Sequence, residues 1–187
     1  MWRGVLLRHT QGMNDKSLSH QLSYLLRHAP HEAGLTLLPG AWTPLEPLLA
    51  HLNVSRSQVE AVVQASDKGR FALRDTASGP QIRANQGHSV PVDLELEATQ
   101  PPSVLFHGTV GAALGSIRAE GLTRRNRHHV HLSPDQYTAR KVGERRGPPV
   151  ILTVQAGKMA QAGHLFYRSD NGVWLVDAVP VEFIEFP

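Results

Sequence analysis

The chain has 187 residues, of which 41% are hydrophobic, so it is long enough for one large domain or two small ones with packed cores. It has no cysteine, which excludes disulfides, thiol nucleophiles and thiolate metal sites, and it has no apolar run of membrane-spanning length. The 19 basic and 16 acidic residues make it mildly basic; bases cluster at 124–127 and 139–146, which suits a face for a polyanion or ordinary solvated arginines equally well.

The first half of the chain predicts three helices and a hairpin. Residues 1–16 are expected to be a flexible extension, with Met13 as an alternative start. The first helix ends near His28, because Pro30 disfavours helix in the residue before it. Capping boxes at 43–46 and 55–58 open a second and a third helix. One face of the first helix is marked by four leucines at helical spacing: Leu18, Leu22, Leu25 and Leu26.

Two strands at 70–73 and 81–83 complete this half, so residues 17–90 are predicted to form a winged-helix lobe. Such a lobe is often used on nucleic acids, although a fold alone does not establish a function. Residues 91–103 carry acids and two adjacent prolines without helical period, and we expect a linker there.

Residues 104–187 predict a second, β-rich lobe, which makes the fold class α+β. Helices are expected over 109–120 and after a cap at 133–135. Short strands are expected at 104–106, 129–132, 150–154, 165–167, 173–176 and 181–186.

Residues 82–89 read Ile-Arg-Ala-Asn-Gln-Gly-His-Ser, and this octet is the most informative stretch of the chain. Apart from Ile82 and Ala84, none of its side chains is expected in a core. It offers a guanidinium, two amides, an imidazole, a hydroxyl and a glycine where the backbone can bend or lie close to a ligand. The octet therefore predicts a loop that binds a polar ligand.

Several cations have a structural explanation as well as a functional one. Arg27 and His28 end the first helix, where the helix dipole favours positive charge. Arg70 follows Gly69 and could be a strand-edge charge. The pair at 145–146 lies between two glycines and could be a solvated turn.

The strings around three histidines suggest ligand binding. Residues 107–109 read His-Gly-Thr and join a predicted strand to a predicted helix, so Thr109 and the first free amides could receive an anion. His129 and His131 alternate on a strand and face the same side. Two such histidines could bind zinc, but no acidic or thiol ligand lies at suitable spacing, so no metal is expected.

In chain order, these segments resemble the RNA 2′-phosphotransferase (KptA-like) family from about residue 17 to the C-terminus. The octet and the string His-Val-His-Leu-Ser at 129–133 are highly specific, whereas the lone arginine matches are not. The family usually has Leu-Asp before a Gly-Trp pair, and this chain instead has Leu-Leu-Pro-Gly-Ala-Trp at 37–42. The other matching strings are residues 25–30, 34–35, 68–71, 107–109 and 142–147.

The resemblance implies a winged-helix RNA lobe joined to an ADP-ribosyltransferase-like lobe that binds NAD⁺. It also implies the reaction, in which an RNA 2′-phosphate attacks the nicotinamide ribose and expels nicotinamide. The ribose 2″-hydroxyl then attacks the phosphate. The products are RNA with a 2′-OH and ADP-ribose 1″,2″-cyclic phosphate, with NAD⁺ consumed as a co-substrate and no metal required.

The resemblance also implies site residues. A catalytic tetrad maps to Arg27, His28, Arg70 and Arg145, with Arg146 competing for the last position. We assign the polar side chains of the octet to the contact between the lobes, where they order it or touch the RNA or the transferred phosphate: Arg83, Asn85, Gln86 and His88. Residues that resemble the NAD⁺ site, including a His-His-hydrophobic signature, are His107, Gly108, Thr109, His131, Ser133 and Val173.

This chemistry accounts for the residue types. The nucleophile is already a phosphate dianion, so the first step needs arginine forks rather than a base. In the second step the departing RNA 2′-oxygen needs a proton, which His28 can carry. Many protein-modifying relatives have Glu at the position of Val173; a carboxylate would repel the phosphate by roughly 1–4 kcal/mol at ~4 Å, so Val173 suits a phosphate substrate.

The sequence leaves three other functions open. One is an ADP-ribosyltransferase that caps terminal phosphates of RNA or DNA, and another is a non-catalytic winged-helix sensor of NAD⁺ or ADP-ribose. A zinc hydrolase is the third. The leading expectation is a cytoplasmic monomer whose partners are 2′-phosphorylated RNA and NAD⁺, without a membrane.

Overall fold

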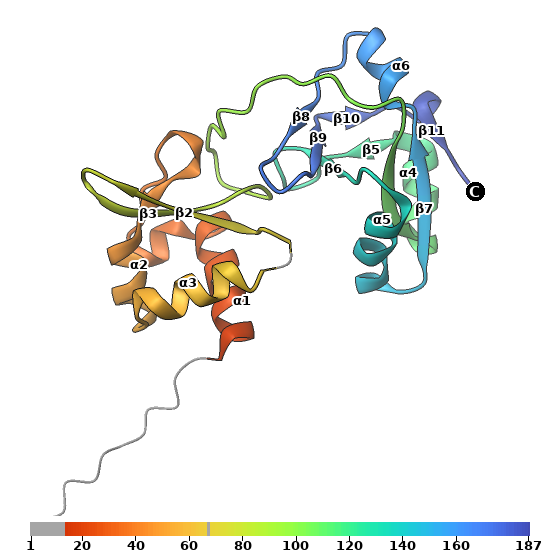
Figure 1. The fold of residues 1–187 in the computed structure, drawn as a ribbon. Coiled ribbons are helices and arrows are strands. Elements are labelled where there is room, and N and C mark those ends of the chain that lie inside the picture. Colours follow the sequence, from red (N-terminus) through yellow and green to blue (C-terminus); the bar gives the residue numbers. More distant parts are fainter. Residues whose placement is uncertain (1–13, 67) are drawn as a thin grey trace, which may run out of the picture.

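The computed structural model describes residues 14–66 and 68–187 of the chain. Helices and strands are mixed, and two hydrophobic cores lie on either side of a segment without regular elements (Figure 1). We call residues 14–84 the N-terminal half and residues 105–187 the C-terminal half. Most of the predicted extension at 1–16 falls outside the described residues, but residues 15 and 16 already belong to the first helix.

The N-terminal half contains three helices that pack against a three-stranded antiparallel sheet of order β1-β3-β2. Its α-helices are α1 (Asp15–Arg27), α2 (Leu45–Leu52) and α3 (Arg56–Gln64). Its strands are β1 (Thr43–Pro44), β2 (Phe71–Thr76) and β3 (Gly79–Ala84).

Helix α1 confirms the leucine pattern, since Leu18, Leu22, Leu25 and Leu26 are all buried in the core of this half. The helix ends at Arg27 with His28 as its C-cap, as Pro30 predicts. Because four buried leucines occupy one face of α1, the polar residues of the helix lie on the opposite face. Arg27 is the last residue of the helix.

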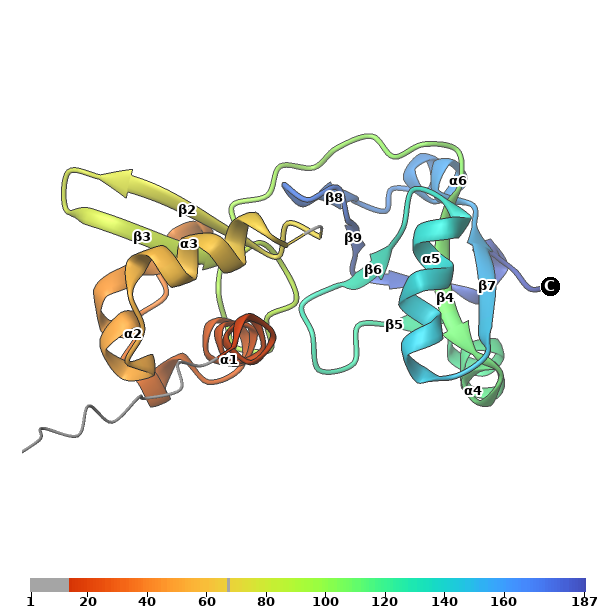
Figure 2. The same cartoon turned by 60° about the horizontal axis from the view of Figure 1, so that its bottom comes forward.

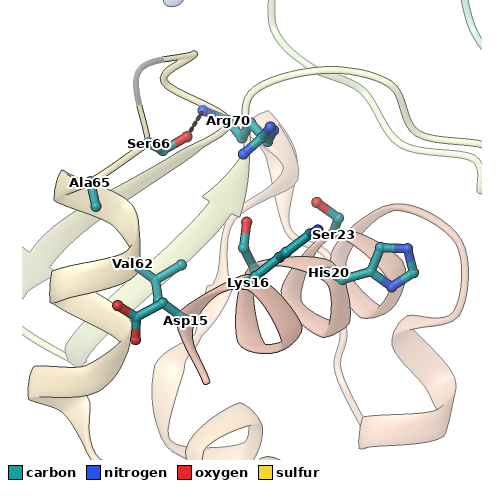
Figure 3. Close-up of a pocket in the computed structure, with 9 residues that line it drawn as sticks. Asp15, Lys16, His20, Ser23, Val62, Ala65, Ser66 and Arg70 are labelled. Atoms are coloured by element: carbon teal, nitrogen blue, oxygen red, sulfur yellow. Dashed lines mark hydrogen bonds between the residues drawn. The ribbon is translucent and has the colours of Figure 1, made fainter. Parts of the chain in front are cut away.

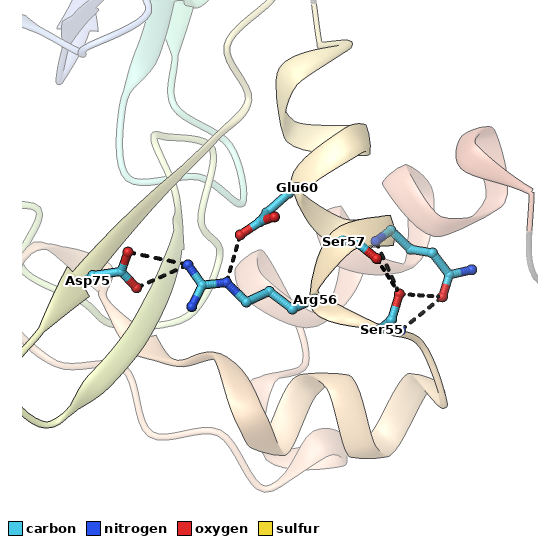
Figure 4. A network of polar contacts seen from close by, with 6 residues as sticks. Ser55, Arg56, Ser57, Glu60 and Asp75 are labelled. Atoms are coloured by element: carbon cyan, nitrogen blue, oxygen red, sulfur yellow. Dashed lines mark hydrogen bonds and ion pairs between the residues drawn. The ribbon is translucent and has the colours of Figure 1, made fainter.

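The two predicted capping boxes have different outcomes. Ser55 forms the predicted box, accepting from the Gln58 backbone N–H while the Gln58 side chain accepts from the Ser55 N–H (Figure 4). The box at Thr43 is wrong, because α2 begins at Leu45 without a side-chain cap. Thr43 is instead buried in β1, where it pairs with Ile82 of β3.

The segment between the halves, residues 85–104, has no helix and a single isolated bridge, from Ala98 to Tyr167. It nevertheless contacts both halves. The Gly40 N–H donates to the Asp93 carbonyl at 2.9 Å, and the Thr99 N–H donates to the Phe166 carbonyl at 2.7 Å. The segment expected to be a linker is therefore held against the protein along its length.

The C-terminal half has three short antiparallel sheets, with orders β11-β7-β4, β6-β9-β8 and β10-β5. Its strands are β4 (Leu105–Val110), β5 (Leu122–Thr123), β6 (Val130–Leu132), β7 (Pro149–Val154), β8 (Tyr167–Arg168), β9 (Trp174–Val176), β10 (Ala178–Val179) and β11 (Ile184–Glu185). Its α-helices are α4 (Leu114–Glu120), α5 (Gln136–Gly143) and α6 (Ala156–Gln161).

Helix α5 packs on β4 and β7, in front of them in Figure 2. Gly108 of β4 permits this packing, because a Cβ there would lie 1.8 Å from the Ala139 carbonyl oxygen of α5. The predicted cap of this helix is confirmed at Asp135, whose side chain accepts from the Thr138 N–H at 2.7 Å.

Three predicted elements of this half need correction. The helix expected over 109–120 begins only at Leu114, because β4 stays paired with β7 through Val110. The strand expected over 181–186 is a 3-10 turn, Val181–Phe183, followed by the two residues of β11. Strand β8 covers Tyr167–Arg168 instead of 165–167. No helix in the described part of the chain has the length and apolarity needed to span a membrane.

Candidate functional site

Arg27 and His28 lie where α1 ends, beside the last residue of the octet. The Ser89 N–H donates to the Arg27 carbonyl at 2.9 Å, and the Ser89 hydroxyl lies 2.8 Å from Nδ1 of His28. The octet therefore fixes the end of the helix and the direction of the imidazole. Arg27 is half-buried, and its Nε is buried without a hydrogen-bond partner in the described structure.

Arg70 immediately precedes β2, and the octet holds this position as well. The Asn85 N–H donates to the Arg70 carbonyl at 3.0 Å, and the Asn85 side chain donates to the Gly69 carbonyl at 2.7 Å. Gly69 has a φ of +48°, in the left-handed region that glycine adopts most readily. One short stretch thus positions two arginines that are far apart in the sequence.

The octet differs from the loop that its composition predicts. Its first three residues belong to β3, and Asn85 and His88 are buried although they are polar. Gln86 and Gly87 are half-buried. Asn85 is buried because its amide completes the backbone hydrogen bonding of Gly69.

Arg83, the remaining polar member, is already engaged in contacts within the protein. It forms an ion pair with Asp170, donates to the Gly40 carbonyl at 3.2 Å and lies 4.6 Å from the centre of the Trp42 ring. Because Asp170 belongs to the C-terminal half, Arg83 joins the two halves.

Gly87 marks the place where the halves meet around the candidate site. Its φ is +91°, and a Cβ at this position would lie 3.7 Å from Cδ of Arg27 and 3.8 Å from Cε1 of His131. Arg27 comes from α1 and His131 from β6. The octet therefore passes between a cation of the N-terminal half and a histidine of the C-terminal half, and we call this place the seam.

Arg127 also reaches the seam, and the sequence analysis missed it. Its Nη1 donates to Nδ1 of His131 at 3.0 Å. Its charge is among the causes that lower the pKa values of Arg27 and His28, behind burial in both cases. The sequence feature that could have indicated Arg127 is its position four residues before His131, within the basic run at 124–127.

The two histidines of the predicted NAD⁺ site are neutral and have defined tautomers. Nδ1 of His107 donates to the His131 carbonyl at 3.0 Å, because a carbonyl can only accept. Nδ1 of His131 accepts from Arg127, because a guanidinium can only donate. Burial lowers the pKa of His107, and burial and the Arg127 charge lower the pKa of His131 to about 3.

The other residues assigned to that site lie on neighbouring strands. Ser133 follows β6 and pairs with Phe106 of β4, whereas Val173 precedes β9, the strand paired with β6. Thr109 is buried within β4, which removes the predicted anion site at a helix start. The need for a glycine at position 108 is explained by the close packing of β4 against α5.

The seam concentrates positive charge without acidic partners. Among the described residues, no ion pair includes Arg27, Arg70 or Arg127. Burial, followed by the charges of Arg127 and Arg70, lowers the pKa of Arg27 to about 10. Such a cluster is unfavourable until an anion enters it, because like charges repel and burial removes water from them.

Two histidines next to this cluster respond to the same field. His88 is buried with both ring nitrogens unpartnered, and burial and the Arg27 charge lower its pKa to about 3. The exposed His28 has its pKa lowered by desolvation, then by Arg27 and Arg127. The imidazoles at the seam are therefore neutral near pH 7.

Arg145 and Arg146 lie in a 3-10 turn after α5, Glu144–Arg146, and both are exposed. The charge of Arg146 lowers the pKa values of His107 and Arg127, whereas the charge of Arg145 is felt by Arg127 alone and less strongly. Of these two charges, that of Arg146 acts more strongly on the residues of the seam, and the assignment of Arg145 to the tetrad stays a prediction.

His129 and His131, the pair considered for zinc, do not gather further metal ligands from the residues that the structure describes. Within residues 14–66 and 68–187, no three histidine or acidic side chains are grouped so that they could hold a metal ion. His129 instead lies 3.9 Å from a carboxylate oxygen of Asp177 and contacts the Tyr167 ring.

A second set of contacts joins the halves at the turn that precedes Arg70. The side chain of Asn171, in the loop between β8 and β9, donates to the Lys68 carbonyl at 2.7 Å, and its Cβ lies 3.1 Å from the position a Gly69 Cβ would take. Together with the pair between Arg83 and Asp170, this loop fixes the C-terminal half against the turn that carries Arg70.

Comparison with known proteins identifies the family to which the chain belongs. The profile of the RNA 2′-phosphotransferase, Tpt1 / KptA family matches residues 13–178. A "Probable RNA 2'-phosphotransferase" of Streptomyces griseus is 50% identical over 177 residues, covering 89% of this chain and 94% of its own. Proteins with the same description in Nostoc punctiforme and Burkholderia lata are 48% and 51% identical, covering 92% and 90% of this chain and 99% and 89% of their own. The chain therefore belongs to the RNA 2′-phosphotransferase, Tpt1 / KptA family.

Proposed function

We propose that this protein removes an internal RNA 2′-phosphate by transferring it to NAD⁺, with the N-terminal half as a winged-helix RNA lobe and the C-terminal half as an ADP-ribosyltransferase-like lobe. The observation that carries the proposal is the convergence of Arg27, Arg70 and Arg127 at the seam, without an acidic partner among the described residues. A dianionic phosphate is the natural occupant of such a cluster, because guanidinium forks match its oxygens.

The first step needs a bound nucleophile and no base. A phosphate oxygen of the RNA attacks C1″ of the nicotinamide ribose, and the bond to nicotinamide breaks. Arginine cannot accept a proton at neutral pH, so Arg27 and Arg70 serve to hold and orient the phosphate. They come from the N-terminal half, where the octet fixes the backbone carbonyls of both residues.

In the second step the ribose 2″-hydroxyl attacks phosphorus, and the bond to the RNA 2′-oxygen breaks. The departing oxygen needs a proton, and the hydroxyl must lose one. His28 suits this transfer because it is exposed at the seam and is oriented by Ser89. Desolvation and, after it, the charges of Arg27 and Arg127 lower the pKa of His28 in the free protein. A bound dianion offsets those charges, so phosphate binding raises the affinity of His28 for a proton.

The C-terminal half would hold the co-substrate NAD⁺. His107, His131, Ser133 and Val173 lie on or beside adjoining strands, and Nε2 of each histidine is directed away from the bond that fixes its Nδ1. His131 can therefore offer an N–H and His107 an acceptor to a polar ligand. Thr109 is too buried to make an obvious contact, and we give Gly108 a packing role.

We further propose Arg127, instead of Arg145, as the last member of the catalytic tetrad. Arg127 contacts His131 and acts electrostatically on both Arg27 and His28, which places it between the two halves. Both Arg127 and Arg145 are exposed, but the charge of Arg145 reaches only Arg127 in this group.

The test is incubation of the protein with an oligonucleotide carrying one internal 2′-phosphate, with and without NAD⁺, followed by mass analysis of both products. We expect 2′-OH RNA, nicotinamide and ADP-ribose cyclic phosphate only when NAD⁺ is present. The same oligonucleotide with a plain 2′-OH is the control. A product that retains ADP-ribose on a terminal phosphate would instead identify a capping transferase, and absence of nicotinamide release would overturn the proposal.

A further inference from the structure

A groove with many polar residues in its lining runs between α1 and the end of α3 and leads to Arg70 (Figure 3). It encloses about 380 Å³ and has an apolar floor formed by Val62 and Ala65. The Arg70 N–H donates weakly to the Ser66 hydroxyl at 3.4 Å, which ties the upper wall to the end of α3. The polar side chains that line the groove are Asp15, Lys16, Ser19, His20, Ser23, Ser66 and Arg70.

The wall supplied by α1 is one continuous polar face. Lys16, His20, Ser23 and Arg27 follow one another at intervals of four, three and four residues, so they share a face of the helix. The core leucines occupy the opposite side. From Lys16 to Arg27 the helix rises by about 16 Å at 1.5 Å per residue. The groove and the seam are thus connected by a single row of side chains.

The chemistry of this wall suits a sugar–phosphate backbone. Lys16 and Arg70 provide positive charge, and the serine hydroxyls can donate to phosphate oxygens or bond ribose hydroxyls. At roughly 3.4 Å per stacked nucleotide, the row on α1 matches about four or five nucleotides of one strand. Asp15 is the single carboxylate of the lining, and it lies at the end of α1 farthest along the chain from Arg27.

We propose that this groove binds the RNA strand next to the 2′-phosphate and guides that strand from the seam along α1. The inference rests on the proposed function, since it assumes that the phosphate occupies the arginines at the seam. Contacts along the groove are made to the backbone, so they add affinity for longer RNA without selecting its sequence. The bound bases are then free to vary along the groove.

The experiment compares two substrates that carry the same internal 2′-phosphate: a trinucleotide, confined to the seam, and a longer oligonucleotide, extended on both sides. Lys16→Ala should raise KM for the longer RNA by about threefold to tenfold and reduce the salt dependence of its binding by about one counterion. Lys16→Ala should leave the KM for the trinucleotide unchanged. It should also leave kcat with either RNA and the KM for NAD⁺ unchanged. Lys16→Glu should enlarge the same difference.

Arg56→Ala is the matched control. Arg56 is also an exposed cation of the N-terminal half, but it lies on α3 with Glu60 and Asp75 as partners and outside the groove lining (Figure 4). Its loss should affect both RNAs equally and slightly. If Lys16→Glu and the unaltered protein have equal KM values for the longer RNA, the proposal that the groove binds RNA is wrong. The proposed function would still stand in that case, provided that the unaltered protein turns over both RNAs. If the unaltered protein turns over neither RNA, the proposed function itself fails.

Discussion

Arg83 and Arg27 both lie where the halves meet, and the protein treats their charges differently. We call the surroundings of Arg83 the compensated side of the seam and those of Arg27 the uncompensated side. Arg83 is compensated by Asp170, by the Gly40 carbonyl and by the face of Trp42. Arg27 faces Arg70 and Arg127, and no ion pair among the described residues includes it. Compensated charge holds the halves together, whereas uncompensated charge leaves a place for an anion. Variants on the two sides should therefore change different quantities.

The largest expected effect belongs to the uncompensated side. Arg127→Ala should lower kcat/KM for 2′-phosphorylated RNA by about 10²–10³, the range found when one donor to a developing charge is removed. The free energy of unfolding should change little, because the loss of the hydrogen bond to His131 is offset by the removal of a repelling cation. Arg145→Ala should stay within about threefold of the unaltered protein, because its charge does not act on Arg27 or His28. Equal losses in the two variants would return Arg145 to the tetrad.

His28→Ala should separate the two steps of the reaction. Nicotinamide release should continue, because the first step needs no proton transfer. The RNA-2′-phospho-ADP-ribose intermediate should then accumulate, and quenched samples analysed by mass should show it. General acid–base catalysis typically contributes about 10²–10⁴-fold, which sets the expected loss in final product. A variant that releases no nicotinamide would show that His28 acts earlier.

The buried histidines predict a dependence of stability on pH. The pKa values of His88 and His131 are lowered to about 3, well below the value of about 6.5 in an unfolded chain. The unfolded state therefore binds more protons below pH 6.5, and stability is lost as pH falls from there toward 3. Each histidine should contribute roughly 1.4 kcal/mol per pH unit to that slope.

Denaturant unfolding between pH 7 and 5 measures this slope. His88→Gln should reduce it by about one proton while leaving the contribution of His131. Inorganic phosphate should also reduce it if the anion binds at the seam, because a nearby negative charge favours the protonated imidazoles. A free energy of unfolding that does not change over this pH range would contradict the neutral, buried state of both rings.

The features of the fold that the sequence predicted correctly depend on local interactions. The leucine spacing of α1, its end before Pro30 and the capping box at Ser55 each depend on residues within a few positions of one another. The box at 43–46 has the same local signal, but pairing of β1 with β3 overrides it. Likewise, the pairing of β4 with β7 delays the helix after residues 107–109.

What the sequence could not predict depends on contacts across the fold. Asn85 and His88 are buried although their side chains are polar, and Asn85 is held by the Gly69 carbonyl, which is distant in sequence. The hydrogen bond of Arg127 to His131 and the effect of its charge on Arg27 arise only when the fold brings its loop to the seam. Family strings identified the octet, but its function as a support for Arg27, His28 and Arg70 is visible only in three dimensions.

The smallest expected effect belongs to the compensated side. Asp170→Asn removes an ion pair in which the Asp170 side chain is 58% exposed, and such pairs are typically worth about 0–1 kcal/mol. Asn171→Ala removes a hydrogen bond to the Lys68 carbonyl, worth about 1 kcal/mol. If these contacts serve only to fix the halves, each variant should show a small loss of stability and a modest rise in KM, with kcat little changed. A loss in kcat as large as that of Arg127→Ala, in a folded variant, would mean that the placement of the C-terminal half over Arg70 limits the chemistry, and the distinction between the two sides of the seam would then fail.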